Sequence, residues 1–348
     1  MKILLTGHNG YIGSVMGPFL SSKGHDVVGL DVGYFSGTNF LPDKHEGRFP
    51  LIDIRDIGAS SSLKGFDAVV HLAALSNDPI GNLQPEWTES INTDGTLRLA
   101  ELVKKAGVQR FLFSSSCIMY GAASLAEVDE TAPLDPKTDY ARSKVVAEDG
   151  LRALADDRFS PTFIRNGTVY GLSPRMRFDT VLNNFVGQAV ATGKIVIFSN
   201  GEPWRPVVHV EDVSRTFLMF LEAPIEKVHN HAFNNGSDEL NWRVIDLAKA
   251  AQSAVPGSQI ELRAQSDADQ RTYRASFAKF RKAFPDFRFK WNPRTGAADL
   301  AQAFSRIGLD RVMFESSDFT RLKWLKSLIA DGKLDRDLRW TEAALASV

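Results

Sequence analysis

Three residues near the middle of the chain have the types and the spacing needed to take a proton from a hydroxyl group. Ser116 follows an apolar segment, and Tyr140 and Lys144 are one turn apart on the same face of a predicted helix. An ammonium close to a phenol favours the phenolate and lowers the pKa of the tyrosine from its usual value near 10. The serine hydroxyl can then hold the oxygen whose proton the tyrosine takes. Because Tyr-x-x-x-Lys occurs on many helices by chance, its meaning depends on the elements around it.

The first 31 residues predict such an element, a binding site for a dinucleotide. An apolar strand at residues 2–6 leads into a turn that contains Gly7, Gly10 and Gly13, and a helical pattern then leads to a second strand. In a unit of this kind the first glycine allows a tight turn. The second lets the backbone approach a pyrophosphate, and the third lets the helix pack against the strand. The N–H groups at the start of the helix hold the phosphates.

The second strand ends at Asp31, which predicts the kind of dinucleotide. A carboxylate at this place accepts hydrogen bonds from the adenosine ribose hydroxyls and repels a 2′-phosphate. The residues that follow, Val32-Gly33-Tyr34, provide no cation for such a phosphate. We therefore expect NAD to bind in preference to NADP.

Strand and helix patterns alternate through the first half of the chain, which is typical of a parallel sheet covered on both faces. The predicted strands lie at residues 2–6, 26–31, 49–52, 67–72, 109–115 and 161–166. The predicted helices lie at residues 12–22, 85–106, 140–156, 178–192, 211–222 and 242–254. Thr93-Asp94-Gly95-Thr96 and Thr138-Asp139 have side chains suited to capping the helices at 85–106 and 140–156.

After residue 170, loops rich in Pro, Gly and Arg separate shorter elements. We expect an α/β fold, a Rossmann-like doubly wound parallel sheet with a smaller C-terminal α/β lobe that binds substrate. The predicted domains are residues 1–170, an interleaved second lobe at 171–300, and a helical C-terminal extension at 301–348. Residues 305–348 are expected to form one or two amphipathic helices that pack on the body in a structural role.

The bulk composition excludes several classes of protein. A hydrophobic content of 43% in 348 residues is ordinary for a globular protein, and the net charge of -1 argues against nucleic acid as a partner. No apolar run approaches the length of a membrane span, and Met1-Lys2 leads directly into a short strand without a signal peptide. The seven histidines show no ligand spacing, so no metal is expected. The single cysteine, Cys117, is consistent with a cytoplasmic protein.

Several further motifs make the chain resemble the extended short-chain dehydrogenase/reductases, in particular the NAD-dependent sugar epimerase/dehydratase branch. The resemblance covers residues 1 to about 300. It includes the glycine turn, Asp53-Ile54-Arg55-Asp56, His71-Leu72-Ala73-Ala74, Asn92, the segment from Ser116 to Gly121, and the pair Tyr140 and Lys144. The resemblance implies that Asp53 binds the adenine amino group, that Asn92 braces the active-site helix, and that the lysine also holds the nicotinamide ribose. The residues expected to bind NAD are Gly7, Gly10, Tyr11, Ile12, Gly13, Asp31, Asp53, Ile54, Leu72, Ala73, Ala74, Asn92, Ser114, Tyr140 and Lys144.

The residues after the catalytic serine distinguish between branches of this family. The 4,6-dehydratases that this chain resembles have an Asp-Glu pair directly after the catalytic hydroxyl, where this chain has Cys117-Ile118. Related decarboxylases usually have a glutamate there, which is also absent. GDP-mannose 3,5-epimerases use a cysteine acid in this region, but Cys117 is one residue before that position, so a buried structural cysteine is favoured. The apolar run most resembles the UDP-hexose 4-epimerases, which need no further acid or base.

The resemblance also implies residues that bind the substrate. Ser116, Thr168, Asn184, Arg205 and Arg271 lie where such epimerases contact the sugar, the diphosphate and the nucleoside, with Arg274 as a competitor of Arg271. An arginine suits a phosphate because its planar fork donates two hydrogen bonds. Thr168 replaces an asparagine of these epimerases, and the loop at 173–177 is unlike that of the galactose epimerase, so the sugar need not be galactose.

The expected function is NAD-dependent epimerisation of a nucleotide sugar at C4, with Ser116, Tyr140 and Lys144 as the catalytic residues. One alternative is one-way oxidation or reduction of a modified nucleotide sugar in the same site, and another is a non-catalytic NAD-binding protein. The helices at 85–106 and 140–156 are expected to pair with those of a second copy, which gives a homodimer.

Overall fold

The centre of the molecule is a six-stranded parallel sheet. The computed structural model describes residues 1–42, 51–58, 63–76, 78–81, 83–121, 127–263 and 272–345. From one edge to the other, the strands are β2 (Asp26–Leu30), β1 (Lys2–Thr6), β3 (Ala68–His71), β4 (Arg110–Ser116), β6 (Ser160–Asn166) and β10 (Ala232–Asn235). This order has its switch point between β1 and β3, where a dinucleotide binds in Rossmann-like folds. The predicted fold class is therefore confirmed.

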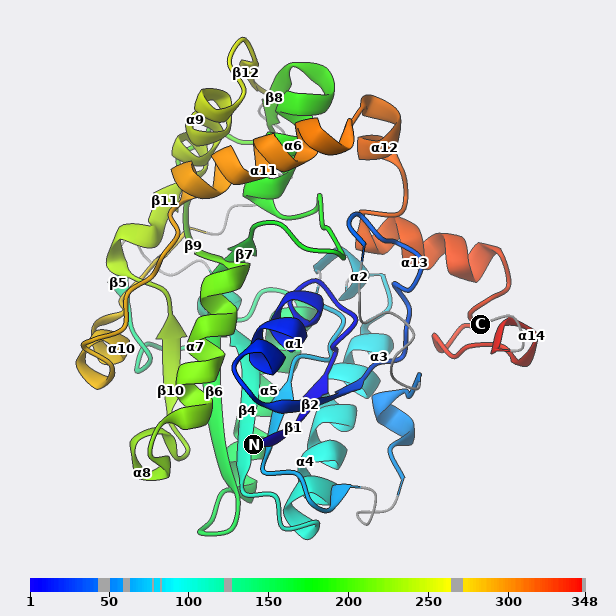
Figure 1. Ribbon diagram of the computed structural model, residues 1–348, viewed down its shortest axis with the longest axis vertical. Coiled ribbons are helices and arrows are strands. Elements are labelled where there is room, and N and C mark those ends of the chain that lie inside the picture. Colours follow the sequence, from blue (N-terminus) through cyan, green and yellow to red (C-terminus); the bar gives the residue numbers. More distant parts are fainter. Residues whose placement is uncertain are drawn as a thin grey trace.

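Helices cover both faces of this sheet (Figure 1). Ile3 and Leu5 of β1 lie in one core with residues of α1 (Gly13–Ser22) and α7 (Val210–Glu222). Leu4 lies in another core with residues of α4 (Gly95–Lys105) and α5 (Asp139–Leu154). Alternate side chains of one strand point to opposite faces, so a strand buried on both faces must be apolar throughout.

The predicted helix at 85–106 contains a wide turn that the sequence pattern did not indicate. It consists of α3 (Pro85–Thr88), the π-helical segment η3 (Glu89–Asp94) and α4. Asp94 has helical backbone angles, and its side chain makes no capping hydrogen bond, so the cap predicted at Thr93–Thr96 was wrong. The other predicted cap is confirmed, because the Thr138 hydroxyl accepts a hydrogen bond from the Ala141 amide at the start of α5.

A second lobe lies above the carboxyl ends of the strands (Figure 1). Its core contains α6 (Val181–Thr192), α9 (Val244–Ala254) and α11 (Pro293–Ile307). Its strands are β7 (Thr168–Tyr170), β9 (Trp204–His209) and β11 (Asn241–Arg243) in one sheet, with β8 (Lys194–Ile197) paired to β12 (Gln259–Leu262) and β5 (Glu127–Val128) paired to β13 (Arg274–Ala275). The shorter helices of the chain are α2 (Asp78–Gly81), α8 (Ile225–Val228) and α10 (Ala278–Ala283), with the 3₁₀ turns η1 (Ile54–Asp56), η4 (Cys117–Tyr120) and η5 (Asp238–Leu240).

The sheet and the second lobe exchange segments. Strand β10 completes the sheet and α7 covers it, although both come from the part of the chain after residue 170. A boundary at residue 170 therefore does not separate the sheet and its covering helices from the second lobe. Of the predicted strand at 49–52, residues 49 and 50 lie outside the described residues, and Leu51 makes a single parallel bridge to Asp31.

The C-terminal residues pack against the loop that follows β2. They form α12 (Arg311–Glu315), α13 (Arg321–Ala330) and α14 (Glu342–Leu345) (Figure 1). The indole N–H of Trp324 donates to the Tyr34 carbonyl at 2.6 Å, and that of Trp340 donates to the Val32 carbonyl at 2.7 Å. The Tyr34 hydroxyl donates in turn to the Leu338 carbonyl. The extension is thus attached to one particular loop of the sheet domain.

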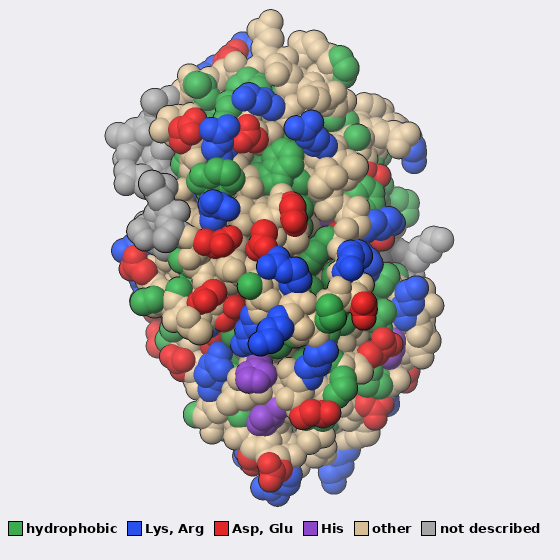
Figure 2. Space-filling view, turned by 90° about the vertical axis from the view of Figure 1, so that its left-hand side faces the viewer, with side chains coloured by type: hydrophobic (Ala, Val, Ile, Leu, Met, Phe, Trp, Pro, Cys, Tyr) green, Lys and Arg blue, Asp and Glu red, His purple; other side chains and the backbone are tan. Residues whose placement is uncertain are grey.

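Figure 2 shows basic and acidic side chains intermingled over one face of the molecule, without an extended basic area on that face. Within the described residues, no helix is both long enough and apolar enough to cross a bilayer.

Candidate active site

A cavity of about 710 Å³ lies between the carboxyl edge of the sheet and the second lobe. It brings together residues from the turn after β1 and from β2, β4, α5, β7 and α6, which are far apart in the sequence. The predicted site residues that line it are Gly7, Gly10, Tyr11, Ile12, Gly13, Asp31, Asp53, Ile54, Leu72, Ala73, Ala74, Ser114, Ser116, Tyr140, Lys144, Thr168, Asn184 and Arg205.

The glycine turn at one end of this cavity cannot accept side chains at two of its three glycines. Gly7 has φ +72°, and a Cβ there would lie 2.7 Å from the Ala73 nitrogen. A Cβ on Gly13 would lie 2.1 Å from the Gly7 carbonyl oxygen. Gly10 meets only that same carbonyl oxygen, at 3.2 Å. The backbone of the turn is therefore bare where it borders the cavity, which fits the close approach of a pyrophosphate.

Asp31 lies beside this turn at the end of β2. Its carboxylate accepts hydrogen bonds from the Asn9 amide at 3.0 Å and from the Gly33 amide at 2.8 Å. These two bonds fix its orientation, and a carboxylate has further lone pairs that can accept hydroxyl groups. The geometry fits the ribose-binding role predicted for Asp31.

Asp53 lines the same end of the cavity, but arginines already engage its carboxylate. Arg55 donates to it from Nε at 3.0 Å and from Nη2 at 2.6 Å, and Nη1 of Arg339 is 3.2 Å away. The predicted contact with the adenine amino group would have to share this carboxylate with two guanidinium groups. The sequence pattern gave no sign of this competition, because Arg339 belongs to the C-terminal extension.

The three candidate catalytic residues meet in the middle of the cavity. Ser116 ends β4, and its side chain lies close enough to Tyr140 on α5 to affect the pKa of the phenol. One turn further along the helix, the Lys144 ammonium donates to the Ser114 carbonyl at 2.8 Å. The Nζ atom of Lys144 lies 5.8 Å from the centre of the Tyr140 ring. The predicted spacing thus places the serine, the phenol and the ammonium together.

The titration of these groups differs from the expectation. The pKa of Tyr140 is raised to about 12, because burial and the Asp78 carboxylate raise it by more than Arg177 and Ser116 lower it. Burial lowers the pKa of Lys144 to about 7, against a smaller opposing effect of Glu148. The prediction that the pKa of the tyrosine is lowered was therefore wrong for this structure, because desolvation outweighs the effects of Arg177 and Ser116 that lower it.

Asn92 acts on the site without lining the cavity. Its buried carboxamide accepts from the Leu75 amide at 2.8 Å and donates to the Leu75 carbonyl and, at 3.2 Å, to the Ser143 hydroxyl. Leu75 lines the cavity, and Ser143 precedes Lys144 on α5. These contacts support the bracing role implied for Asn92. The direct contact with NAD predicted for it has no support here, because Asn92 does not line the cavity. The π-helical turn η3 carries this residue, as such turns often do at functional sites.

Three of the residues predicted for the substrate lie at the other end of the cavity. Thr168 lies on β7, Asn184 lies on α6 with its amide donating to the Phe178 carbonyl, and Arg205 lies on β9. Arg271 lies outside the described residues. Its competitor Arg274 stacks on Trp204, with the guanidinium carbon 5.3 Å from the ring centre.

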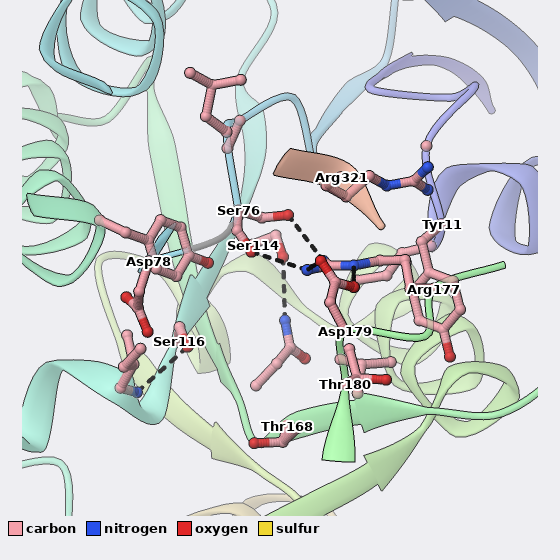
Figure 3. Close-up of a pocket in the computed structure, with 18 of the residues that line it drawn as sticks. Tyr11, Ser76, Asp78, Ser114, Ser116, Thr168, Arg177, Asp179, Thr180 and Arg321 are labelled. Atoms are coloured by element: carbon pink, nitrogen blue, oxygen red, sulfur yellow. Dashed lines mark hydrogen bonds and ion pairs between the residues drawn. The ribbon is translucent and has the colours of Figure 1, made fainter. Parts of the chain in front are cut away.

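The cavity also contains polar residues that the sequence analysis did not identify. The Arg177 guanidinium pairs with Asp179 at 2.8 Å and donates to the Ser76 hydroxyl at 3.1 Å (Figure 3). Asp78 accepts from the Thr138 hydroxyl at 2.7 Å and lies close enough to Tyr140 to affect its pKa (Figure 3). Arg177 lies on a loop after β7 and Asp78 begins the one-turn helix α2, and neither position is marked by a periodic pattern. The loop at 173–177 was noted only for its difference from the galactose epimerase.

Cys117 has no chemical access to this site. The side chain is fully buried, its thiol donates to the Arg165 carbonyl, and burial raises its pKa. The neighbouring Ile118 lines the cavity instead. The structure confirms the prediction of a buried cysteine at this position.

Comparison with known proteins gives related sequences and folds. The chain matches the model described as "NAD dependent epimerase/dehydratase family" over residues 3–236. A UDP-glucose 4-epimerase of Bacillus subtilis (strain 168) is 30% identical over 289 residues, which cover 76% of this chain and 84% of that protein. The structure of MoeE5 in complex with UDP-glucuronic acid and NAD has a TM-score of 0.76 at 25% identity, covering 88% of this chain and 99% of the other. TunA, an NAD-dependent NDP-hexosamine 5,6-dehydratase, has a TM-score of 0.79 at 22% identity, covering 88% and 98%, and shares the fold.

Proposed function

The chain belongs to the NAD-dependent epimerase/dehydratase family, and from this premise we propose that it epimerises a nucleotide sugar at C4 by transient oxidation. The family and the cofactor agree with the prediction from the motifs. When bound, NAD supplies a hydride acceptor that takes the hydride from C4 and returns it to the opposite face of the sugar. Net redox change is zero, so the cofactor is expected to stay bound through turnover.

The observation that carries this proposal is that Ser116, Tyr140 and Lys144 line the same cavity as the glycine turn. The serine hydroxyl holds the C4 oxygen of the sugar, and the tyrosine takes the proton of that oxygen. Lys144, fixed on the Ser114 carbonyl, holds the ribose next to the reacting carbon. Thr168 and Arg205 are expected to orient the sugar and the diphosphate at the other end of the cavity.

The side chains around Ser116 favour epimerisation over elimination of water. Elimination needs a further acid and base, and the two residues after Ser116 provide none, since Cys117 is buried and Ile118 is apolar. One observation supports dehydration as a second candidate. Asp78 brings a carboxylate to the cavity near Tyr140 from a different part of the chain.

The test is to incubate the purified protein with UDP-glucose, UDP-galactose and other nucleotide sugars without added NAD(H), and to analyse the products by NMR. Epimerisation gives a C4 stereoisomer, dehydration gives a keto sugar that has lost one water, and one-way oxidation or reduction gives product only when NAD(H) is added and consumed. Tyr140→Phe should abolish turnover while the protein stays folded, as judged by its thermal melt. Turnover by that variant would overturn the catalytic assignment. A folded, NAD-binding protein with no product from any sugar would instead support the non-catalytic alternative.

A further inference from the structure

Arg321, at the start of α13, is a C-terminal residue that lines the cavity (Figure 3). Only 4% of the residue is exposed. Its guanidinium stacks on Phe35, with 3.9 Å between the guanidinium carbon and the ring centre, and Nη2 donates to the Arg175 carbonyl at 3.0 Å. The group is thus held in one orientation by an aromatic ring and a backbone carbonyl.

The charge of this guanidinium is not balanced by an ion pair in the described part of the chain. Its Nη1 is buried without a hydrogen-bond partner there. The nearby Asp179 carboxylate is already paired with Arg177, and Asp31 accepts two backbone amides. The pKa of Arg321 is lowered to about 9, because burial and the charges of Arg177 and Arg175 lower it by more than Asp179 and Asp31 raise it. An unpaired buried cation is costly, so a cation kept in such a place fits an anionic ligand.

The position of Arg321 indicates which part of a ligand it faces. Arg175, whose carbonyl accepts from Arg321, donates to the side chain of Asn9 within the glycine turn at 2.7 Å. Arg321 is also close enough to Tyr11 to lower the pKa of that phenol, and close enough to Asp31 for the carboxylate to raise the pKa of the guanidinium. The glycine turn and the Arg321 guanidinium therefore lie at the same end of the cavity, away from Thr168 and Arg205. The anion expected at the turn is the diphosphate of the dinucleotide.

The segment that carries Arg321 is attached to the loop next to the adenosine site. Trp324 and Trp340 donate to the carbonyls of Tyr34 and Val32, directly after Asp31. Arg55, which holds Asp53, donates to the Leu338 carbonyl at 3.1 Å. The same few residues thus connect the C-terminal segment to both carboxylates predicted to bind adenosine.

We propose that the C-terminal segment 321–340 completes the dinucleotide site, and that Arg321 donates a hydrogen bond from Nη1 to the diphosphate of the bound dinucleotide. The cation at the diphosphate then comes from the opposite end of the chain from the glycine turn. This role depends on the family's use of NAD and is independent of which reaction the sugar undergoes.

The test measures binding to the full-length protein freed of cofactor, by calorimetry, with NAD, ADP-ribose and adenosine as ligands. Arg321→Gln should weaken the binding of ADP-ribose and NAD by roughly ten- to a hundredfold, because it removes one charge-assisted hydrogen bond. The affinity for adenosine should stay unchanged. Arg321→Lys should restore part of the affinity, since it keeps the charge but not the planar fork. Lys326→Gln is the matched control, because it makes the same charge change on an exposed position of the same helix and should change nothing.

Three results would overturn the proposal. If Arg321→Gln weakens UDP binding to the NAD-loaded protein but not ADP-ribose binding, the guanidinium serves the substrate diphosphate. If wild-type protein binds NADP more tightly than NAD and the variant loses only that preference, the guanidinium serves a 2′-phosphate. If the thermal melt falls while all affinities stay the same in both Arg321 variants, the residue has a structural role only.

Discussion

Lys144→Met should make the stability of the protein less dependent on pH. Only 4% of Lys144 is exposed, and burial lowers the pKa of its ammonium from 10.5 to about 7. Between about pH 7 and pH 10.5 the unfolded chain therefore binds a proton that the folded protein has released, so the free energy of unfolding rises with pH. Below pH 7 both states carry the proton, and the folded protein bears the whole cost of the buried charge.

The size of this effect follows from the two pKa values. A difference of about 3.5 pKa units corresponds to roughly 5 kcal/mol, of which about 2–3 kcal/mol is recovered between pH 6 and pH 9. Replacing the ammonium by the uncharged thioether removes this increase in the free energy of unfolding with pH. The variant should be more stable than wild type at pH 6, by somewhat less than 5 kcal/mol because the hydrogen bond to the Ser114 carbonyl is also lost.

The assay is urea unfolding of the cofactor-free protein at pH 6, 7.5 and 9 for wild type and Lys144→Met. Lys105→Met, at an exposed position of α4, serves as the control and should keep the wild-type pH dependence. Parallel pH curves for wild type and Lys144→Met would refute the reasoning, because they would mean that the pKa of the lysine is the same in the folded and unfolded states.

Four further predictions follow from the described geometry. Asp78→Asn should lower the pKa of the catalytic tyrosine and move the acidic limb of the kcat/KM profile to lower pH, whereas complete loss of activity would make this carboxylate a proton donor in its own right. Gly13→Ala should destabilise the protein by about 3 kcal/mol in urea unfolding, because its Cβ meets backbone at 2.1 Å, whereas Gly17→Ala on the same helix, at 3.4 Å from a side chain, should not. Asp31→Ala should narrow the preference for NAD over NADP by roughly ten- to a hundredfold, chiefly by weakening NAD, and equal affinities in wild type would contradict this. Light scattering at micromolar concentration should show a dimer that Val146→Asp dissociates, since Val146 on α5 is 50% exposed, and a wild-type monomer would exclude the dimer.

The sequence was sufficient to predict the elements that repeat a regular pattern. Strand β1 and the glycine turn lie where the apolar run and the three glycines indicated, because a parallel strand buried on both faces must be continuously apolar. Tyr140 and Lys144 meet Ser116 because helix α5 has a regular period and begins at a side-chain cap. These features depend on local rules that a single segment of sequence contains.

The features that were missed depend on contacts between distant segments. The pairing of Asp53 with Arg339 joins residues that are 286 positions apart, and the Asp78 carboxylate is held by Thr138, which is 60 positions away. The pKa of Tyr140 was predicted in the wrong direction because its burial is a property of the whole cavity. The π-helical turn at Asn92 was missed since its residues fit an ordinary amphipathic helix equally well.

The attachment of the loop after β2 to Trp324, Leu338 and Trp340 has a consequence for how the protein is made. The ribosome synthesises Tyr34 290 residues before Trp324, and the other two residues that hold this loop follow still later. The βαβ unit therefore cannot reach its final packing until the chain has been synthesised as far as Trp340. The adenosine loop precedes the second lobe in the sequence but is set in place only after that lobe has been made.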